Sequence, residues 1–357
     1  MPPTAAAEPT ARALAERVAE RAQALARCSE EPDRLTRRFA TPALADACAL
    51  AGGWMRAAGM TAGTDAVGNL RGRYEGARAG APALLLGSHL DTVRDAGRWD
   101  GALGVLVALA AVERLHAAGR RLPFALELAG FADEEGVRYG TAYLGSSALA
   151  GTFDAAWLAR RDAGGTTMAD ALRAAGGDPD AVASARRDPA TLLGYVEVHI
   201  EQGPALEAAG APLGVVTGIA GQTRARLTTH GRAGHAGTVP MQLRRDALCA
   251  AAELVLDAEA QARATPELVA TVGELAVAPG AGNVIPGEVA LSLDVRHAQD
   301  AVRAAAVAQL RERAGGLAAA RGVALDWETA LDQPAVACDA RLTAMLERAV
   351  AAGGGAP

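Results

Sequence analysis

The sequence predicts an α/β fold in two parts: a larger α/β domain around a central mixed sheet and an inserted ferredoxin-like domain. Between residues 81 and 132, an apolar run, a helical pattern and a second apolar run follow one another, as in the crossover unit of layered α/β proteins. From residue 214 onward the periodicity has the order β-α-β-β-α-β. A chain of 357 residues is also long enough for two hydrophobic cores.

The first part of the chain alternates helical and extended patterns in a simple order. Apolar residues at helical spacing predict helices, and alternating or continuous apolar runs predict strands. The predicted elements are a helix at Thr10–Arg27, a helix at Pro42–Ala58, strands within residues 67–76 and 81–89, a helix at Gly104–Ala118 and a strand at Pro123–Ala132.

Residues 152–189 are polar, contain glycine and have a helical pattern in patches, and we expect them to form a surface excursion. The chain then returns as the strand GYVEVHIEQGP, residues 194–204, whose alternation places His199 and Glu197 on one face. The ferredoxin-like domain is predicted at residues 217–329. It would interrupt a first domain formed by residues 1–216 and 330–357.

The charged residues exclude several kinds of function. The formal net charge is −6, so no basic surplus is present for binding nucleic acid or an anionic membrane. All 35 basic residues are arginine, which excludes lysine nucleophiles, Schiff bases and the lysine-dependent phosphate loop. The motifs G-x-S-x-G and G-x-G-x-x-G are also absent, which disfavours a serine hydrolase and a dinucleotide-binding protein.

The cysteines and the apolar runs bear on location. The four cysteines are far apart, and we expect them to be reduced, buried small hydrophobes: Cys28, Cys48, Cys249 and Cys338. No uninterrupted apolar region resembles a signal peptide, and no uncharged apolar run is long enough to span a membrane. The predicted location is the cytoplasm.

Polar residues with metal-binding side chains follow the two predicted buried strands. His89 and Asp91 end the first of them, and the Asp91 carboxylate could accept a hydrogen bond from the second ring nitrogen of His89. Asp100 precedes Gly101 at a helix entrance, where it could cap the helix, bind a metal, or do both. A structural histidine is the alternative interpretation for His89.

Two adjacent acids follow the second buried strand. Beside a cation, Glu134 and Glu135 could divide their roles, with one binding the metal and the other acting as a general base. The alternative is a pair of solvated loop charges. His199 lies between Glu197 and Glu201 in EVHIEQGP. Taken alone, a structural histidine is the favoured interpretation, but together with the earlier candidates we expect it to be the third ligand of one metal.

The second domain contributes a further set of donors. His235 lies in a loop between small residues, Asn283 in GAGNVIPG and Arg296 in LDVRH. Together they are typical of an anion and oxyanion clamp, although turn and strand-surface roles are common for such residues. The remaining histidines have no such setting and are interpreted as surface residues: His116, His230 and His297.

Five long motifs resemble one known group of enzymes. They are GSHLDTVRDAGRWDGALGV, FADEEGVRYGTAYLGSSALAG, VEVHIEQGPALE, GIAGQTRARLTTHGRAGHAGTVPM and GNVIPGEVALSLDVRH. They resemble the dinuclear amidohydrolases of the carbamoylase and allantoate amidohydrolase group, in the clan of the metal-dependent carboxypeptidases and aminoacylases. DEEGVR with LGSSALAG, and GVVTGIAGQTR with GHAGTVPM, are most similar to allantoate amidohydrolases.

The resemblance implies a catalytic domain with two divalent metal ions, zinc or manganese, and a ferredoxin-like lid that dimerises the protein. His89 and His199 would bind one metal, Asp100 would bridge, and Glu135 would bind the other. The implied role of Glu134 is the general base, and that of Asp91 is to orient His89. His235 would stabilise the oxyanion across a homodimer interface, while Gln202, Asn283 and Arg296 would hold the substrate, with Arg296 pairing with its carboxylate.

The implied reaction is cleavage of a ureido group on a small carboxylate in purine or ureide catabolism, with allantoate giving ureidoglycine, ammonia and carbon dioxide. The alternatives are an N-carbamoyl-L-amino acid hydrolase, a β-ureidopropionase-like enzyme, or an inactive truncated dimerising remnant. The last alternative arises because the group has a further histidine near its C-terminus, a ligand of the metal bound by Glu135. No histidine follows His297 here, so the second metal site is expected to lack that ligand.

Overall fold

The computed structural model describes residues 9–355, which form two compact units. The first unit ends at Pro204 and the second begins at Ala205. The predicted domain boundaries, with residues 330–357 assigned to the first domain, stay a prediction. Among residues 9–355, no helix combines the length and apolar character needed to cross a membrane.

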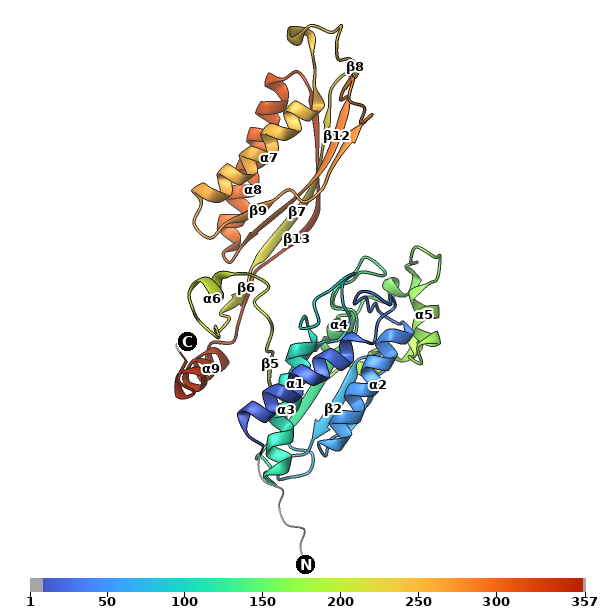
Figure 1. The fold of residues 1–357 in the computed structure, drawn as a ribbon, viewed down its shortest axis with the longest axis vertical. Coiled ribbons are helices and arrows are strands. Elements are labelled where there is room, and N and C mark those ends of the chain that lie inside the picture. The colour runs from blue at the N-terminus through green and yellow to red at the C-terminus, as the bar shows by residue number, and fades with distance from the viewer. Residues whose placement is uncertain (1–8, 356–357) are drawn as a thin grey trace, which may run out of the picture. The chain divides into compact units, whose positions relative to one another are not determined.

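The first unit is built on a five-stranded mixed sheet, as predicted (Figure 1). Its order is β1-β2-β4-β3-β5, with β3 parallel to β4 and β5, and β2 antiparallel to β1 and β4. The strands are β1 (Thr61–Thr64), β2 (Leu70–Tyr74), β3 (Ala83–His89), β4 (Ala125–Phe131) and β5 (Leu192–Val196).

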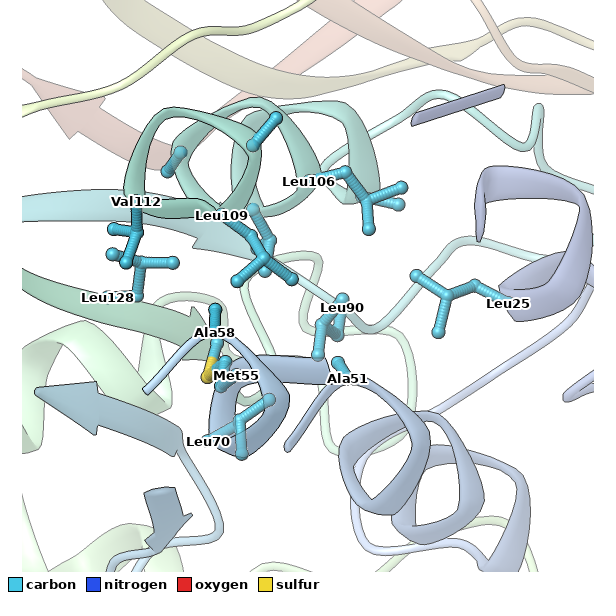
Figure 2. Packing of buried hydrophobic residues seen from close by; sticks show 14 of the residues in the cluster. Leu25, Ala51, Met55, Ala58, Leu70, Leu90, Leu106, Leu109, Val112 and Leu128 are labelled. Atoms are coloured by element: carbon cyan, nitrogen blue, oxygen red, sulfur yellow. The ribbon is translucent and has the colours of Figure 1, made fainter. Parts of the chain in front are cut away.

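Three helices cover one face of this sheet and enclose the main core. They are α1 (Ala11–Ala26), α2 (Pro42–Ala57) and α3 (Ala102–Ala117), close to their predicted bounds. Thr10 and Thr41 cap the first two helices by accepting backbone N–H groups, and Pro42 occupies the first turn of α2. Leu106 and Leu109 of α3 pack with Met55 of α2 and with strand residues (Figure 2). This core contains many alanines, as the composition predicts.

The interpretation of residues 152–189 as a surface excursion was wrong in part. The expected helical patches are present as α5 (Met168–Ala174) and the 3-10 turns η1 (Ala155–Ala159), η2 (Pro179–Ala185) and η3 (Pro189–Thr191), but the segment is not confined to the surface. Its apolar side chains form a third buried cluster with residues that flank the sheet, and α4 (Leu144–Ala150) joins the same cluster. The residues that this segment contributes to the cluster are Met168, Ala171, Leu172, Val182 and Ala185.

The strand predicted at residues 194–204 ends early. β5 stops at Val196, and residues 197–200 leave the sheet as an irregular segment. The carbonyl of Val198 approaches α3 so closely that a Cβ atom on Gly104 would lie 2.3 Å from it. Only glycine allows this contact, so the chain bends onto α3 before His199 instead of continuing the strand.

The second unit has an antiparallel sheet in the order β10-β12-β7-β13, with β9 also paired with β12. Its elements follow the predicted β-α-β-β-α-β order: β7 (Gly221–His230), α7 (Ala247–Ala264), β9 (Val269–Thr271) with β10 (Leu275–Ala278), β12 (Glu288–His297), α8 (Asp300–Ala320) and β13 (Ala324–Gln333). The two helices pack on one face of the sheet, around Leu227, Leu254, Leu291 and Leu310 (Figure 1).

Short elements complete the second unit. A small two-stranded sheet joins β8 (Gly234–His235) to β11 (Val284–Ile285), and another joins β6 (Gly218–Ile219) to β14 (Val336–Ala337). The remaining elements are α6 (Ala205–Ala208), η4 (Met241–Leu243) and α9 (Ala340–Ala352).

Two expectations about side-chain burial were wrong. His297, expected at the surface, is buried because its ring is held between the backbone of Gln299 and the carbonyl of Pro266. The four cysteines are free, but only Cys48 is fully buried, whereas Cys249 and Cys338 are exposed.

Candidate metal centre

The two central parallel strands end at the same edge of the sheet. His89, the last residue of β3, is in register with Phe131, the last residue of β4. The segments that follow these strands therefore meet there, one carrying Asp91 and the other Glu134 and Glu135. His89 is 3% exposed and Asp91 is 1% exposed, so both are buried at the base of this site.

Asp91 contacts His89 through its backbone carbonyl, whereas its carboxylate was predicted to make this contact. Its backbone carbonyl lies 2.9 Å from His89 Nδ1, whereas its carboxylate Oδ1 lies 3.6 Å from that nitrogen. The carboxylate instead accepts the backbone N–H of Glu134 and of Glu135. When Nδ1–H donates to the carbonyl, Nε2 of His89 keeps its lone pair for a metal.

Asp100 is not the cap of α3. The N-cap is Gly101, and no side chain caps this helix end. The Asp100 carboxylate instead lies 3.3 Å from His199 Nε2 and 3.9 Å from His89 Nε2. These three residues present ligand atoms within 4.8 Å of one another. Two imidazoles and one carboxylate form a donor set that suits zinc or manganese.

Glycine is required beside this group. The rings of His89 and His199 stack with their centroids 5.9 Å apart, and Gly101 packs directly against the first of them. A Cβ atom on Gly101 would lie 2.6 Å from three carbons of the His89 ring, and its φ of +62° is a conformation that glycine favours. Gly101 therefore sets where the His89 imidazole can lie.

The acidic loop after β4 forms a second group of possible ligands. His89, Glu134 and Glu135 also bring ligand atoms within 4.8 Å of one another. Burial raises the pKa of Glu134 to about 7, against the opposing charge of His89. Burial raises the pKa of Glu135 as well. A carboxylate that titrates near neutral pH is suited to accept and return a proton.

His89 is electrostatically coupled to these acids. Burial works to lower its pKa, but hydrogen bonding to Asp91 and the charges of Asp91 and Glu134 outweigh this effect and raise the pKa to about 9. Without a metal, His89 is therefore protonated at neutral pH. A divalent ion would have to displace that proton.

The sequence interpretation missed Asp133. This carboxyl is 1% exposed, one of its oxygens has no hydrogen-bond partner among the described residues, and burial raises its pKa to about 8. Its backbone is left-handed, with φ of +55°. The signal in the sequence was the run of three consecutive acids, of which only the last two were singled out.

His199 and Gln202 reach this site from the segment after β5. The Gln202 side chain donates from Nε2 to the Asp100 carboxylate, at 3.0 and 3.2 Å from its two oxygens. Gln202 was predicted to face a substrate, and its amide also lies against the candidate bridging ligand. His199 Nδ1 lies 2.8 Å from the Ile200 carbonyl, so Nε2 is the nitrogen turned to Asp100.

In the second unit, His235 and Asn283 are neighbours. β8 pairs with β11 so that His235 lies opposite Val284, and the Ala236 N–H donates to the Asn283 carbonyl. The His235 ring is exposed, and its Nδ1 accepts the Gly237 N–H over 3.0 Å. The ring proton of the neutral imidazole must therefore lie on Nε2, which is free to donate.

Within the second unit, Arg296 lies far from His235 and Asn283. It lies in the part of β12 that pairs with β9, whereas Asn283 comes just before β11, on the side of Glu288, the first residue of β12. Arg296 comes eight positions after Glu288, which is about 27 Å along an antiparallel strand. The guanidinium forms a two-pronged pair with Asp294. One chain therefore does not bring the predicted clamp of His235, Asn283 and Arg296 together.

Comparison with known proteins gives a consistent set of relatives. The model of peptidase family M20/M25/M40 matches residues 85–356. A probable allantoate deiminase of Oryza sativa subsp. japonica is 43% identical over 351 residues, which cover 92% of this chain and 72% of that protein. An N-carbamoyl-L-amino acid amidohydrolase of Geobacillus stearothermophilus is 43% identical over 300 residues, covering 84% and 73%.

A solved structure agrees with these relatives. The crystal structure of a hydantoinase/carbamoylase family amidase from Burkholderia ambifaria has a TM-score of 0.87 and 37% sequence identity. The match covers 96% of this chain and 84% of that one.

Proposed function

Because this chain belongs to peptidase family M20/M25/M40, we propose for it a reaction carried out by that family's amidohydrolases: hydrolysis of a ureido group on a small carboxylate. Its relatives at 40–43% identity are allantoate deiminases and an N-carbamoyl-L-amino acid amidohydrolase, so the chain is a hydrolase of C–N bonds outside peptides. Allantoate is the leading substrate.

The observation that carries the proposal is the convergence of His89, Asp100 and His199 beside an acidic loop. Ligand atoms of these three residues gather within 4.8 Å, and so do those of His89, Glu134 and Glu135. His89, Asp100 and His199 would hold one divalent ion, and Glu135 would contribute to a second ion that shares Asp100 as a ligand. The metal is zinc or manganese. When bound, such ions acidify water and polarise a carbonyl oxygen.

In the proposed reaction, water adds to the ureido carbon and a C–N bond breaks. Allantoate would give ureidoglycine and carbamate, and carbamate decomposes to ammonia and carbon dioxide. Glu134 accepts the proton of the attacking water and returns it to the leaving nitrogen, a role supported by its pKa of about 7. Asp91 orients the ring of His89 and fixes the backbone of the acidic loop.

The second unit would supply substrate-binding groups. His235 donates from Nε2 to the oxyanion, Arg296 pairs with the substrate carboxylate, and Asn283 and Gln202 bind its polar atoms. Because His235 and Arg296 lie near opposite ends of one sheet, a single copy cannot place both on one small substrate. This separation supports a homodimer in which each site takes Arg296 from one chain and His235 from its partner.

The free state of all four cysteines agrees with a reducing compartment, and we propose that the enzyme acts in the cytoplasm, in ureide breakdown.

The test is a comparison of substrates with metal content measured on the same sample. Ammonia release from allantoate is expected to exceed that from N-carbamoyl-L-amino acids, with two ions bound per chain. The second candidate, N-carbamoyl-L-amino acid hydrolysis, is favoured by the relative from Geobacillus stearothermophilus and would show the reverse preference. Absence of turnover with one ion or none would instead support a non-catalytic, dimerising protein.

A further inference from the structure

Arg37 is a buried cation outside the candidate metal centre. It lies between α1 and α2 and is 1% exposed. Its guanidinium donates to three backbone carbonyls: Nε to Leu90 at 2.6 Å, and one terminal nitrogen to Leu25 at 2.7 Å and Cys28 at 3.1 Å. Leu25 and Cys28 lie at the C-terminal end of α1, where the helix dipole favours a positive charge.

The backbone of Arg37 binds the same loop at a second point. Its N–H donates to the Thr92 hydroxyl at 2.9 Å, and its carbonyl accepts the Thr92 N–H, also at 2.9 Å. Thr92 is itself buried, at 1% exposure. Since the guanidinium holds the Leu90 carbonyl, Arg37 fixes the residues on both sides of Asp91.

Asp91 connects this anchor to the site. Its backbone carbonyl lies within hydrogen-bonding distance of His89 Nδ1. Its carboxylate accepts the backbone N–H groups of Glu134 and Glu135. A shift of the loop at Leu90 would therefore move a histidine ligand and the acidic loop together. The negative charge of Asp91 also attracts the Arg37 cation.

The chemistry of the anchor favours a role in positioning. Within residues 9–355, no carboxylate forms an ion pair with Arg37, and its bonds go to carbonyls and a hydroxyl. Burying an unpaired cation costs stability, and an apolar side chain of similar length would fill the space without that cost. An apolar side chain could not hold the Leu90 carbonyl in place.

We infer that Arg37 is a positioning residue of the metal centre: by fixing Leu90 and Thr92, it places Asp91 and His89 for metal binding. The inference rests on the metal site proposed above. It adds a residue 52 positions before His89. Among the described residues, the hydrogen bonds of Arg37 go to backbone carbonyls and to Thr92, not to a proposed ligand side chain. The effect of Arg37 is on metal affinity, so it can be measured without a substrate.

The experiment is titration of metal-stripped full-length protein with Mn²⁺ in a calorimeter. Arg37→Met is expected to weaken Mn²⁺ binding by roughly 10- to 100-fold, as for other residues that orient ligands. Arg37→Lys keeps the charge, but a point charge cannot reach Leu90 and the α1 carbonyls together. It should therefore fall between Arg37→Met and the unchanged protein.

A matched control separates positioning from general destabilisation. Arg303, 4% exposed in the second unit, is also an arginine with little exposed surface, and it binds Asp300, Asp332 and Thr223. Arg303→Met should lower the melting temperature and leave Mn²⁺ affinity unchanged. Thr92→Val removes only the hydroxyl that accepts the Arg37 N–H, and it should weaken Mn²⁺ binding several-fold while keeping the fold.

The outcomes are distinct. If the unchanged protein binds neither Mn²⁺ nor, in a parallel titration, Zn²⁺, the proposed metal centre is wrong. If it binds Mn²⁺ and the Arg37→Met protein binds equally well, Arg37 has no positioning role. Should Arg37→Met fail to fold, unchanged affinities in Arg37→Lys and Thr92→Val would overturn the inference, and weakened affinities would support it.

Discussion

The carboxylate of Asp91 accepts the backbone N–H of Glu134 over 3.0 Å, so a buried acid after β3 fixes the loop after β4. The other carboxylate oxygen accepts the N–H of Glu135 over 3.1 Å. The proposed base and the proposed ligand are thus held by their main chains, and their side chains stay available. This arrangement makes Asp91 the connection between the two loops of the site.

Asp91→Asn should therefore lower the affinity for metal, although the side chain keeps nearly the same shape. The backbone N–H groups of Glu134 and Glu135 donate to different oxygens of the Asp91 carboxylate. Asparagine has one side-chain oxygen and one NH₂ group, so one of these N–H groups would face a donor instead of an acceptor. We expect a loss of about 1–3 kcal/mol in unfolding free energy. Mn²⁺ affinity, measured by calorimetry, should fall by roughly 10- to 100-fold.

Asp246→Asn is the control for this change. Asp246 caps α7, and both amides that it accepts bind a single oxygen, so asparagine can replace it. Stability and metal affinity should be nearly unchanged. An Asp91→Asn protein that binds Mn²⁺ as tightly as the Asp246→Asn protein would contradict the connecting role of Asp91.

Gly101→Ala should displace His89. The added Cβ would lie 2.6 Å from the buried imidazole, and alanine is also strained at a φ of +62°. This φ of +62° is combined with a ψ of −54°, a sparsely populated conformation that costs a residue with a side chain about 1–3 kcal/mol. We expect a lower melting temperature and loss of bound metal, measured by atomic emission on purified protein. Gly97→Ala, in the same loop with open space around the added atom, should retain its metal. Equal metal content in the two variants would contradict the steric argument.

The position of the candidate ligands could be predicted from the sequence, because it follows from strand order. Two apolar strands joined by a crossover helix are parallel, so residues after their carboxyl ends must meet, and the structure brings His89, Glu134 and Glu135 together. Asp100 and His199 could be singled out by residue type. Whether Asp100 caps α3 could not be predicted, because the answer depends on the backbone geometry at Gly101, which is itself the N-cap.

Other features depend on contacts that leave no periodic signal. The early end of β5 results from one close approach between Val198 and Gly104. The burial of His297 results from bonds to backbone atoms of Gln299 and Pro266, which no pattern of side chains indicates. The same holds for Arg37, whose bonds go mainly to carbonyls. The separation of Arg296 from His235 could be recognised only from the registers of β12 and β8, which the sequence does not provide.

Glu134→Gln should abolish most turnover and keep the metal. The amide has nearly the shape of the acid but cannot accept a proton, so kcat for ammonia release should fall about 10²- to 10⁴-fold. Metal content should be unchanged, whereas Glu135→Gln should lower it. Glu113→Gln, which breaks ion pairs with Arg17 and Arg21 on the helical side of the unit, should leave kcat unaffected. A Glu134→Gln protein with more than about a tenth of normal kcat would exclude Glu134 as the base.

Removing the metal should make stability fall as pH rises. Burial raises the pKa of Asp133 to about 8 and that of Glu134 to about 7, so the folded chain binds more protons than the unfolded chain between these values and about pH 4. His89 acts in the same direction, because its pKa of about 9 exceeds the unfolded value of 6.5. Its contribution is complete below the unfolded value and is lost as pH rises through the folded one.

Urea unfolding of chelator-treated protein should therefore show a falling free energy of unfolding from about pH 5 to pH 9. Divalent ions would replace the displaced protons, so Mn²⁺ should restore most of the loss at the upper end of this range. A metal-free protein whose stability rises with pH over this interval would show that these acids are not enclosed as described.

Mixing two inactive variants tests whether each site is shared between chains. His235→Ala and Arg296→Ala should each lower kcat/KM strongly, because each removes a proposed substrate contact. The two residues lie near opposite ends of one sheet, so a site that uses both must draw them from different copies. In a mixed dimer, the site with Arg296 from the His235→Ala chain receives an intact His235 from its partner. The other site carries both substitutions.

Random assortment makes half of the dimers mixed, with one intact site in each, so an equimolar co-expressed mixture should recover about a quarter of normal activity. The comparison is with the double variant His235→Ala/Arg296→Ala co-expressed with the unchanged chain. There, mixed dimers hold two sites with one substitution each, and only the unchanged dimers, about a quarter of the total, should be active. Sites contained within single chains would give no recovery in the first mixture and about half of normal activity in the second, because every unchanged chain would then work alone.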